Sequence, residues 1–150
     1  RVRFRSEVPE GELLVPIGKA KVAKEGTDLT IVSYSFYMTN VLKAAAQLDK
    51  EGIHVECIDL RTISPLDMDT IYESLKKTKK LMIVHEAVKQ GGVGAEVAAR
   101  TAEEMIDYLD APIVRLGAPF VPIPYTPPLE RLVKIEPEDI IKAVKEMLGR

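Results

Sequence analysis

The chain lacks most of the residue types that mark a self-contained catalytic or metal site. It has 150 residues with no tryptophan, one cysteine (Cys57) and two histidines. One cysteine cannot form an internal disulfide, so we expect a reducing compartment, the cytoplasm. No Cys or His spacing matches a zinc site, and the scattered carboxylates are typical of a solvated surface. No metal site is therefore predicted in this chain.

Charge of one sign and long apolar runs are also missing. The 21 basic residues are balanced by 23 acidic ones, for a net charge of −2, which gives no electrostatic reason to expect a nucleic-acid partner. No apolar run approaches the ~20 residues that cross a bilayer, so no membrane partner is expected. Asn40 is the one asparagine and only two glutamines occur, a bias that favours a thermophilic source.

Apolar, β-branched stretches alternate with segments of helical periodicity along the chain. Strands are expected over residues 18–23, 29–34, 54–60, 81–84 and 111–116, and helices over 38–51, 67–77, 94–106 and 138–148. This alternation predicts an α/β fold, a three-layer open sheet of about five strands, four parallel and one antiparallel. The first two strands are joined by a short turn, so they are expected to pair antiparallel.

The segment after residue 84 carries the strongest local pattern. His85 and Glu86 follow a buried strand, where a histidine beside a carboxylate can do acid–base work near neutral pH. The alternative, which we favour, is a hydrogen-bonded pair that fixes the loop, or an interface contact. Gly91, Gly92 and Gly94 then open a helix, where backbone N–H groups can hold an anion. No dinucleotide or Walker motif is present, so a tight turn with close helix–strand packing is the simpler interpretation.

A proline-rich segment precedes the last helix. Residues 119–128 hold five prolines and are expected to form no regular structure. Such a rigid segment exposes apolar side chains at little entropic cost, which suits a permanent subunit interface through residues such as Pro122, Pro124 and Tyr125. A loop that packs over the edge of its own sheet is the alternative.

Several strings, taken in order, resemble the C-terminal domain of transketolase-like thiamine diphosphate enzymes. They include Pro16-Ile17-Gly18-Lys19-Ala20, Leu60-Arg61-Thr62-Ile63-Ser64-Pro65-Leu66-Asp67, the run from His85 to Glu96, and Pro122-Ile123-Pro124-Tyr125. Within that superfamily the chain looks most like the beta subunit of the E1 component of 2-oxo acid dehydrogenase complexes. The resemblance implies that residues 17–150 form this domain and that residues 1–16 are an extended linker from an upstream thiamine-binding domain.

The resemblance implies an enzyme that decarboxylates a 2-oxo acid with thiamine diphosphate and magnesium and passes the acyl group to the lipoyl group of E2. The catalytic, cofactor and metal residues of such enzymes lie outside the matched region, so this chain alone is expected to bind no cofactor and to be inactive. The implied partners are the E1 alpha subunit, a second beta subunit and the subunit-binding domain of E2. Asp110, Glu130 and the carboxylate of Arg150 are the expected acidic contacts for E2.

Three alternatives remain open. The sequence His85-Glu86-Ala87 resembles branched-chain and archaeal enzymes more than the animal pyruvate enzyme, so the 2-oxo acid is not fixed. The chain also fits the C-terminal domain of a transketolase or a deoxyxylulose-phosphate synthase, which need no E2. From another class, a stand-alone module could bind a phosphate or nucleotide at the Gly91–Gly94 turn.

Overall fold

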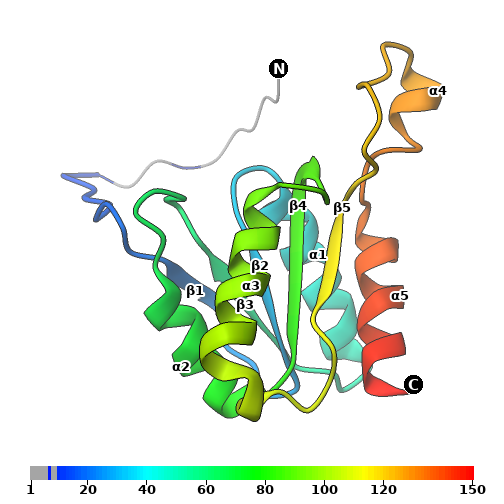
Figure 1. Cartoon of the computed structure of the whole chain (residues 1–150). Coiled ribbons are helices and arrows are strands. Elements are labelled where there is room, and N and C mark those ends of the chain that lie inside the picture. The colour runs from blue at the N-terminus through cyan, green and yellow to red at the C-terminus, as the bar shows by residue number, and fades with distance from the viewer. Residues whose placement is uncertain (1–6, 8–9) are drawn as a thin grey trace.

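The computed structural model describes Glu7 and residues 10–150 as a three-layer α/β domain. Its five-stranded sheet has the order β1-β3-β2-β4-β5, and helices cover both faces (Figure 1). The strands are β1 (Lys21–Lys24), β2 (Leu29–Ser33), β3 (Val55–Asp59), β4 (Leu81–Val88) and β5 (Val114–Ala118). The helices are α1 (Tyr37–Lys50), α2 (Met68–Thr78), α3 (Val93–Met105), the 3-10 helix η1 (Ile106–Tyr108), α4 (Pro127–Glu130) and α5 (Pro137–Leu148).

The core consists of two apolar layers, one on each side of the sheet. Strand β2 is buried along its whole length, and its side chains alternate between the layers. Leu29 and Ile31 pack with α1 and α5 on one face, whereas Val32 packs with α2 and α3 on the other. This burial on both faces explains why apolar residues occur on both sides of the strand rather than in strict alternation with polar ones. The α/β prediction with four parallel strands and one antiparallel strand is confirmed.

The predicted partner of the first strand is wrong. Strand β1 pairs antiparallel with β3, not with β2, because both edges of β2 are taken by the parallel strands β3 and β4. The connection between β1 and β2 instead crosses the start of β3. There the backbone N–H groups of Thr27 and Asp28 both donate to the His54 carbonyl, at 2.8 and 3.0 Å. A short connection therefore does not make two strands neighbours when a third strand lies between them.

The structure describes only part of the predicted linker. Of the predicted linker 1–16, residues 1–6 and 8–9 lie outside the described residues. Residues 10–16 form neither helix nor strand, and their side chains are exposed. The role of residues 1–16 as a linker stays a prediction.

The last helix, α5, is capped at both ends. It begins with a capping box of Glu136 and Asp139, and its C-cap is Gly149 in the left-handed conformation (φ 66°), which glycine adopts without strain.

The proline-rich segment is less irregular than predicted. Residues 119–126 contain no helix or strand, but α4 begins at Pro127. Prolines are tolerated in the first turn of a helix, where their missing N–H group would have no partner. Within the described part of the chain, no helix is long and apolar enough to cross a membrane.

Candidate functional site

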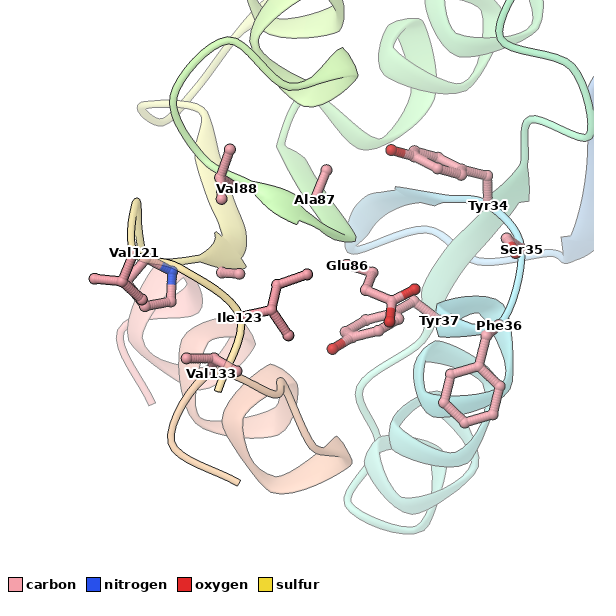
Figure 2. Close-up of a pocket in the computed structure, with 12 residues that line it drawn as sticks. Tyr34, Ser35, Phe36, Tyr37, Glu86, Ala87, Val88, Val121, Ile123 and Val133 are labelled. Atoms are coloured by element: carbon pink, nitrogen blue, oxygen red, sulfur yellow. The ribbon is translucent and has the colours of Figure 1, made fainter. Parts of the chain in front are cut away.

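A crevice opens where β2, β4 and β5 end, the edge at which open parallel sheets usually bind ligands and partners. Its volume is about 380 Å³, within the range of ligand pockets. Figure 2 shows its side chains, which come from the β2–α1 turn, the end of β4 and the segment after β5. The crevice is lined by Tyr34, Ser35, Phe36, Tyr37, Glu86, Ala87, Val88, Ala118, Pro119, Val121, Ile123 and Val133.

A bulge in β4 forms the floor of this crevice. Val84 pairs with Leu116 and Val88 pairs with Ala118, so residues 85–87 of β4 lie opposite Gly117 alone. A Cβ at Gly117 would lie 2.9 Å from the Ala87 carbonyl oxygen, which means that the bulged backbone needs a glycine there. Bulges of this kind change the direction of side chains near functional sites.

His85 and Glu86, which lie in this bulge, have different environments. His85 is fully buried, and neither ring nitrogen has a hydrogen-bond partner among the described residues. Its ring stacks on Tyr34 with centroids 6.2 Å apart, while Glu86 is exposed and lines the crevice. The two residues therefore do not form the hydrogen-bonded pair that the sequence suggested. An acid–base role for His85 or Glu86 stays a prediction.

The glycines of the turn make room for the His85 ring. A Cβ at Gly92 would lie 2.9 Å from Cε1 of His85, and a Cβ at Gly94 would lie 2.7 Å from Cδ2. The tight turn with close helix–strand packing thus accounts for Gly92 and Gly94. Gly91 has a positive φ of 69° with open space around it, so it serves the turn itself. Anion binding by Gly91, Gly92 and Gly94 stays a prediction.

Burial of His85 makes the stability of this domain depend on pH. Burial lowers the pKa of His85 from its usual 6.5, and the nearby Arg115 lowers it further. The unfolded chain therefore binds the proton more readily, so stability is complete above about pH 6.5 and is lost as the pH falls below it. We expect the wild type to lose up to about 1.4 kcal/mol per pH unit relative to His85→Leu.

Unfolding by urea at a series of pH values between 5 and 8 measures this difference. His54→Gln is the matched control, because His54 is exposed and bonded to Asp49 at 3.0 Å. Parallel pH profiles for the wild type and His85→Leu would contradict the prediction.

Residues 119–134, which we call the arm, follow β5 and project beyond the end of the sheet (Figure 1). Its large apolar side chains are exposed: Phe120 by 71%, Ile123 by 89%, Tyr125 by 96% and Leu132 by 76%. The base of the arm is fixed to α1, because the Asn40 amide donates to the Ile135 carbonyl at 2.9 Å. A fixed base with exposed apolar side chains beyond it is typical of a surface that another chain covers.

The structure divides the predicted interface residues between two ends of β5. Pro122, Pro124, Tyr125 and Glu130 lie on the arm after β5, with Glu130 paired to Lys134 at 3.0 Å. Asp110 precedes β5 and is exposed. The C-terminus lies at that same end of the molecule, opposite the arm (Figure 1). These residues therefore belong to two surfaces rather than one.

One side of the crevice is aromatic and was not predicted from the sequence; it consists of Tyr34, Phe36 and Tyr37. A usable signal was present, because these residues directly follow a predicted buried strand and so lie at its carboxyl end. Burial raises the pKa of both tyrosines, and the nearby Glu86 raises it further. Among the described residues, no group of three His, Cys, Asp or Glu side chains is placed to hold a metal ion.

Comparisons with known proteins agree on one family. Residues 18–140 match the model of the transketolase C-terminal domain. The chain is 50% identical over 139 residues to the mitochondrial pyruvate dehydrogenase E1 component subunit beta of Dictyostelium discoideum, covering 93% of the chain and 39% of that protein. It is 46% identical to the subunit beta of Rhizobium meliloti, with shares of 93% and 30%. The chain thus spans well under half the length of these relatives.

Solved structures show the same architecture. A split-gene transketolase, described as an inactive beta4 tetramer, superposes with a TM-score of 0.80 at 28% identity, covering 96% of this chain and 46% of that one. A transketolase from Pichia stipitis superposes with a TM-score of 0.57 at 13% identity, covering 87% of this chain and 18% of that one, and supports the fold alone.

Proposed function

This chain belongs to the transketolase C-terminal domain family and has pyruvate dehydrogenase E1 beta subunits among its homologues, so we propose that it is the C-terminal domain through which an E1 beta subunit assembles with its partners. The complete enzyme decarboxylates a 2-oxo acid with thiamine diphosphate and magnesium and passes the acyl group to the lipoyl group of E2. Pyruvate is the proposed substrate, since the relatives named above are pyruvate enzymes.

The exposed apolar arm is the observation that carries this proposal. Side chains such as Ile123 and Tyr125 are almost fully exposed in the chain by itself, and a domain gains stability when another chain buries them. We propose that a second beta subunit and the alpha subunit cover this surface. The segment 1–16 then leads from the upstream thiamine-binding domain.

The buried chemistry of this chain supports a structural role. His85 is enclosed under the glycine turn. Burial raises the pKa of the Cys57 thiol to about 12, which keeps it protonated and unreactive. We expect the catalytic and cofactor-binding groups in the remainder of the subunit and in the alpha subunit, so this chain alone binds no cofactor and is inactive. A reduced thiol fits the proposed cytoplasmic location.

A second surface, at the end of β5 opposite the arm, is the proposed docking site for E2. Asp110 lies beside an apolar depression formed by Ile106, Leu109 and Pro112. A carboxylate next to exposed apolar side chains suits a basic module that also buries some apolar area.

Charge reversal tests this docking site. In the assembled alpha–beta enzyme, Asp110→Lys is expected to weaken binding of the E2 subunit-binding domain at least about tenfold. Glu103→Lys is the control, because Glu103 is an exposed carboxylate on α3. Calorimetric titration measures both. Equal affinities for Asp110→Lys and the control would contradict the assignment of Asp110.

Similarity to the split-gene transketolase favours a second candidate, the C-terminal part of a transketolase-type enzyme. The same titration separates the two functions, because a transketolase needs no E2 partner. Saturable binding of the E2 domain supports the E1 beta assignment, and its absence in a properly assembled enzyme supports the transketolase. Decarboxylation rates with pyruvate and with a branched-chain 2-oxo acid then identify the substrate.

A further inference from the structure

Glu86 places a carboxylate in a crevice that is otherwise mostly apolar. The bulge in β4 directs it into the crevice, near Tyr37 (Figure 2). Within the part of the chain that the structure describes, no basic side chain forms an ion pair with Glu86. Two basic groups in this part of the domain have other partners: Lys134 pairs with Glu130 at 3.0 Å, and Arg115 donates to the Lys89 carbonyl at 2.8 Å.

The arm carries a complementary group, the guanidinium of Arg131. It follows α4 on the arm and is exposed. Among the described residues, no acidic side chain lies within ion-pair distance of it. Its neighbours on the arm, Leu129 and Leu132, expose 51% and 76% of their surface. Arg131 therefore lies within the same apolar surface that a second subunit is proposed to cover.

The walls of the crevice suit a guanidinium better than an ammonium. Tyr34, Phe36 and Tyr37 line one side and aliphatic residues of the arm line the other. A guanidinium is planar, can pair with a carboxylate through two parallel hydrogen bonds, and packs against aromatic rings. The ammonium of lysine is more strongly hydrated and loses more when such a crevice excludes water.

We infer that two copies of this domain pair through a two-fold axis, with Arg131 of each copy entering the crevice of the other and binding Glu86. A two-fold interface uses the same surface on both copies, so one complementary pair of residues is satisfied twice. The arm supplies both the arginine and one wall of the crevice, so its apolar side chains would be buried in the same contact. This inference rests on the proposed function, because it names the residues of the proposed beta–beta interface.

A charge swap in the full-length beta subunit, assembled with its alpha subunit, tests the pair. Glu86→Arg and Arg131→Glu each place like charges opposite each other, and each is expected to raise the dissociation constant of the beta–beta contact at least about thirtyfold. The double variant Glu86→Arg/Arg131→Glu restores opposite charges and is expected to return within about threefold of the wild type. Sedimentation velocity over a dilution series measures the constants.

Glu103→Arg is the matched control, because it makes the same change on the exposed face of α3. Single variants that behave like this control, or a double variant that is not rescued, would overturn the inference while the proposed function stands. A pair formed within one chain would change the unfolding free energy but not the dissociation constant, and that result also overturns it. A wild-type subunit that shows no beta–beta association would instead contradict the proposed function itself.

Discussion

Replacing Gly26 with alanine is expected to lower the unfolding free energy of this chain by about 3 kcal/mol, the upper end of the usual cost of overpacking. Gly26 is buried where the β1–β2 connection crosses the start of β3. A Cβ there would overlap the backbone of Val55 and Glu56, which belongs to a central strand and cannot move aside. The displacement would also stretch the 3.2 Å hydrogen bond from the Gly26 N–H group to the Glu56 carboxylate.

Thermal unfolding followed by circular dichroism measures the effect, since the chain has no tryptophan to report by fluorescence. A loss of this size corresponds to a fall of roughly 10 °C in the unfolding midpoint. Gly52→Ala is the control: φ is 73° there and nothing lies within 4 Å of the added Cβ. Its cost is expected to be about 1 kcal/mol from backbone strain alone. A Gly26 variant as stable as this control would refute the argument.

Lys77→Met is the second substitution with a large expected effect. The Lys77 ammonium pairs with Glu56, whose side chain is buried, and with Glu25 at 3.1 Å. Burial by itself raises the pKa of Glu56. The hydrogen bonds to its carboxylate, of which the one from Lys77 has the largest effect, lower it more and hold the pKa below the usual 4.5. Removing Lys77 leaves a buried carboxylate without its cation, and the expected loss is roughly 3 kcal/mol at pH 7.

The pH dependence of this loss identifies its cause. In the wild type the lowered pKa of Glu56 contributes stability that is complete above about pH 4.5 and is lost as the pH falls. In Lys77→Met the pKa of Glu56 is expected to rise above that value, so protonation relieves the penalty and the difference from the wild type shrinks toward pH 4. Urea unfolding at pH 7 and pH 4 measures both.

Two variants complete this test. Glu56→Gln/Lys77→Met removes both charges and should recover much of the stability. Lys76→Met removes an exposed lysine paired with Glu73 and should cost less than about 0.5 kcal/mol. A loss at Lys77 no larger than at Lys76, or one that does not change with pH, would contradict the assigned role of Glu56.

The class of fold and the order of its elements could be predicted from local sequence patterns. A strand buried on both faces is rich in apolar and β-branched residues, and an amphipathic helix repeats its apolar residues every three or four positions, so both patterns can be recognised locally. The stretch 29–34 and the helix expected over 38–51 correspond to β2 and α1 in this way. The motif strings pointed to the transketolase C-terminal family, which the family model and the relatives confirm.

The strand order and the grouping of side chains on one surface could be read only from the three-dimensional structure. The pairing of β1 with β3 depends on strands far apart in the chain, and no local pattern records it. His85 and Glu86 are adjacent on β4, and the packing around that strand buries the first and leaves the second in the crevice. Local periodicity specifies an element, whereas a site is formed by residues that long-range packing brings together.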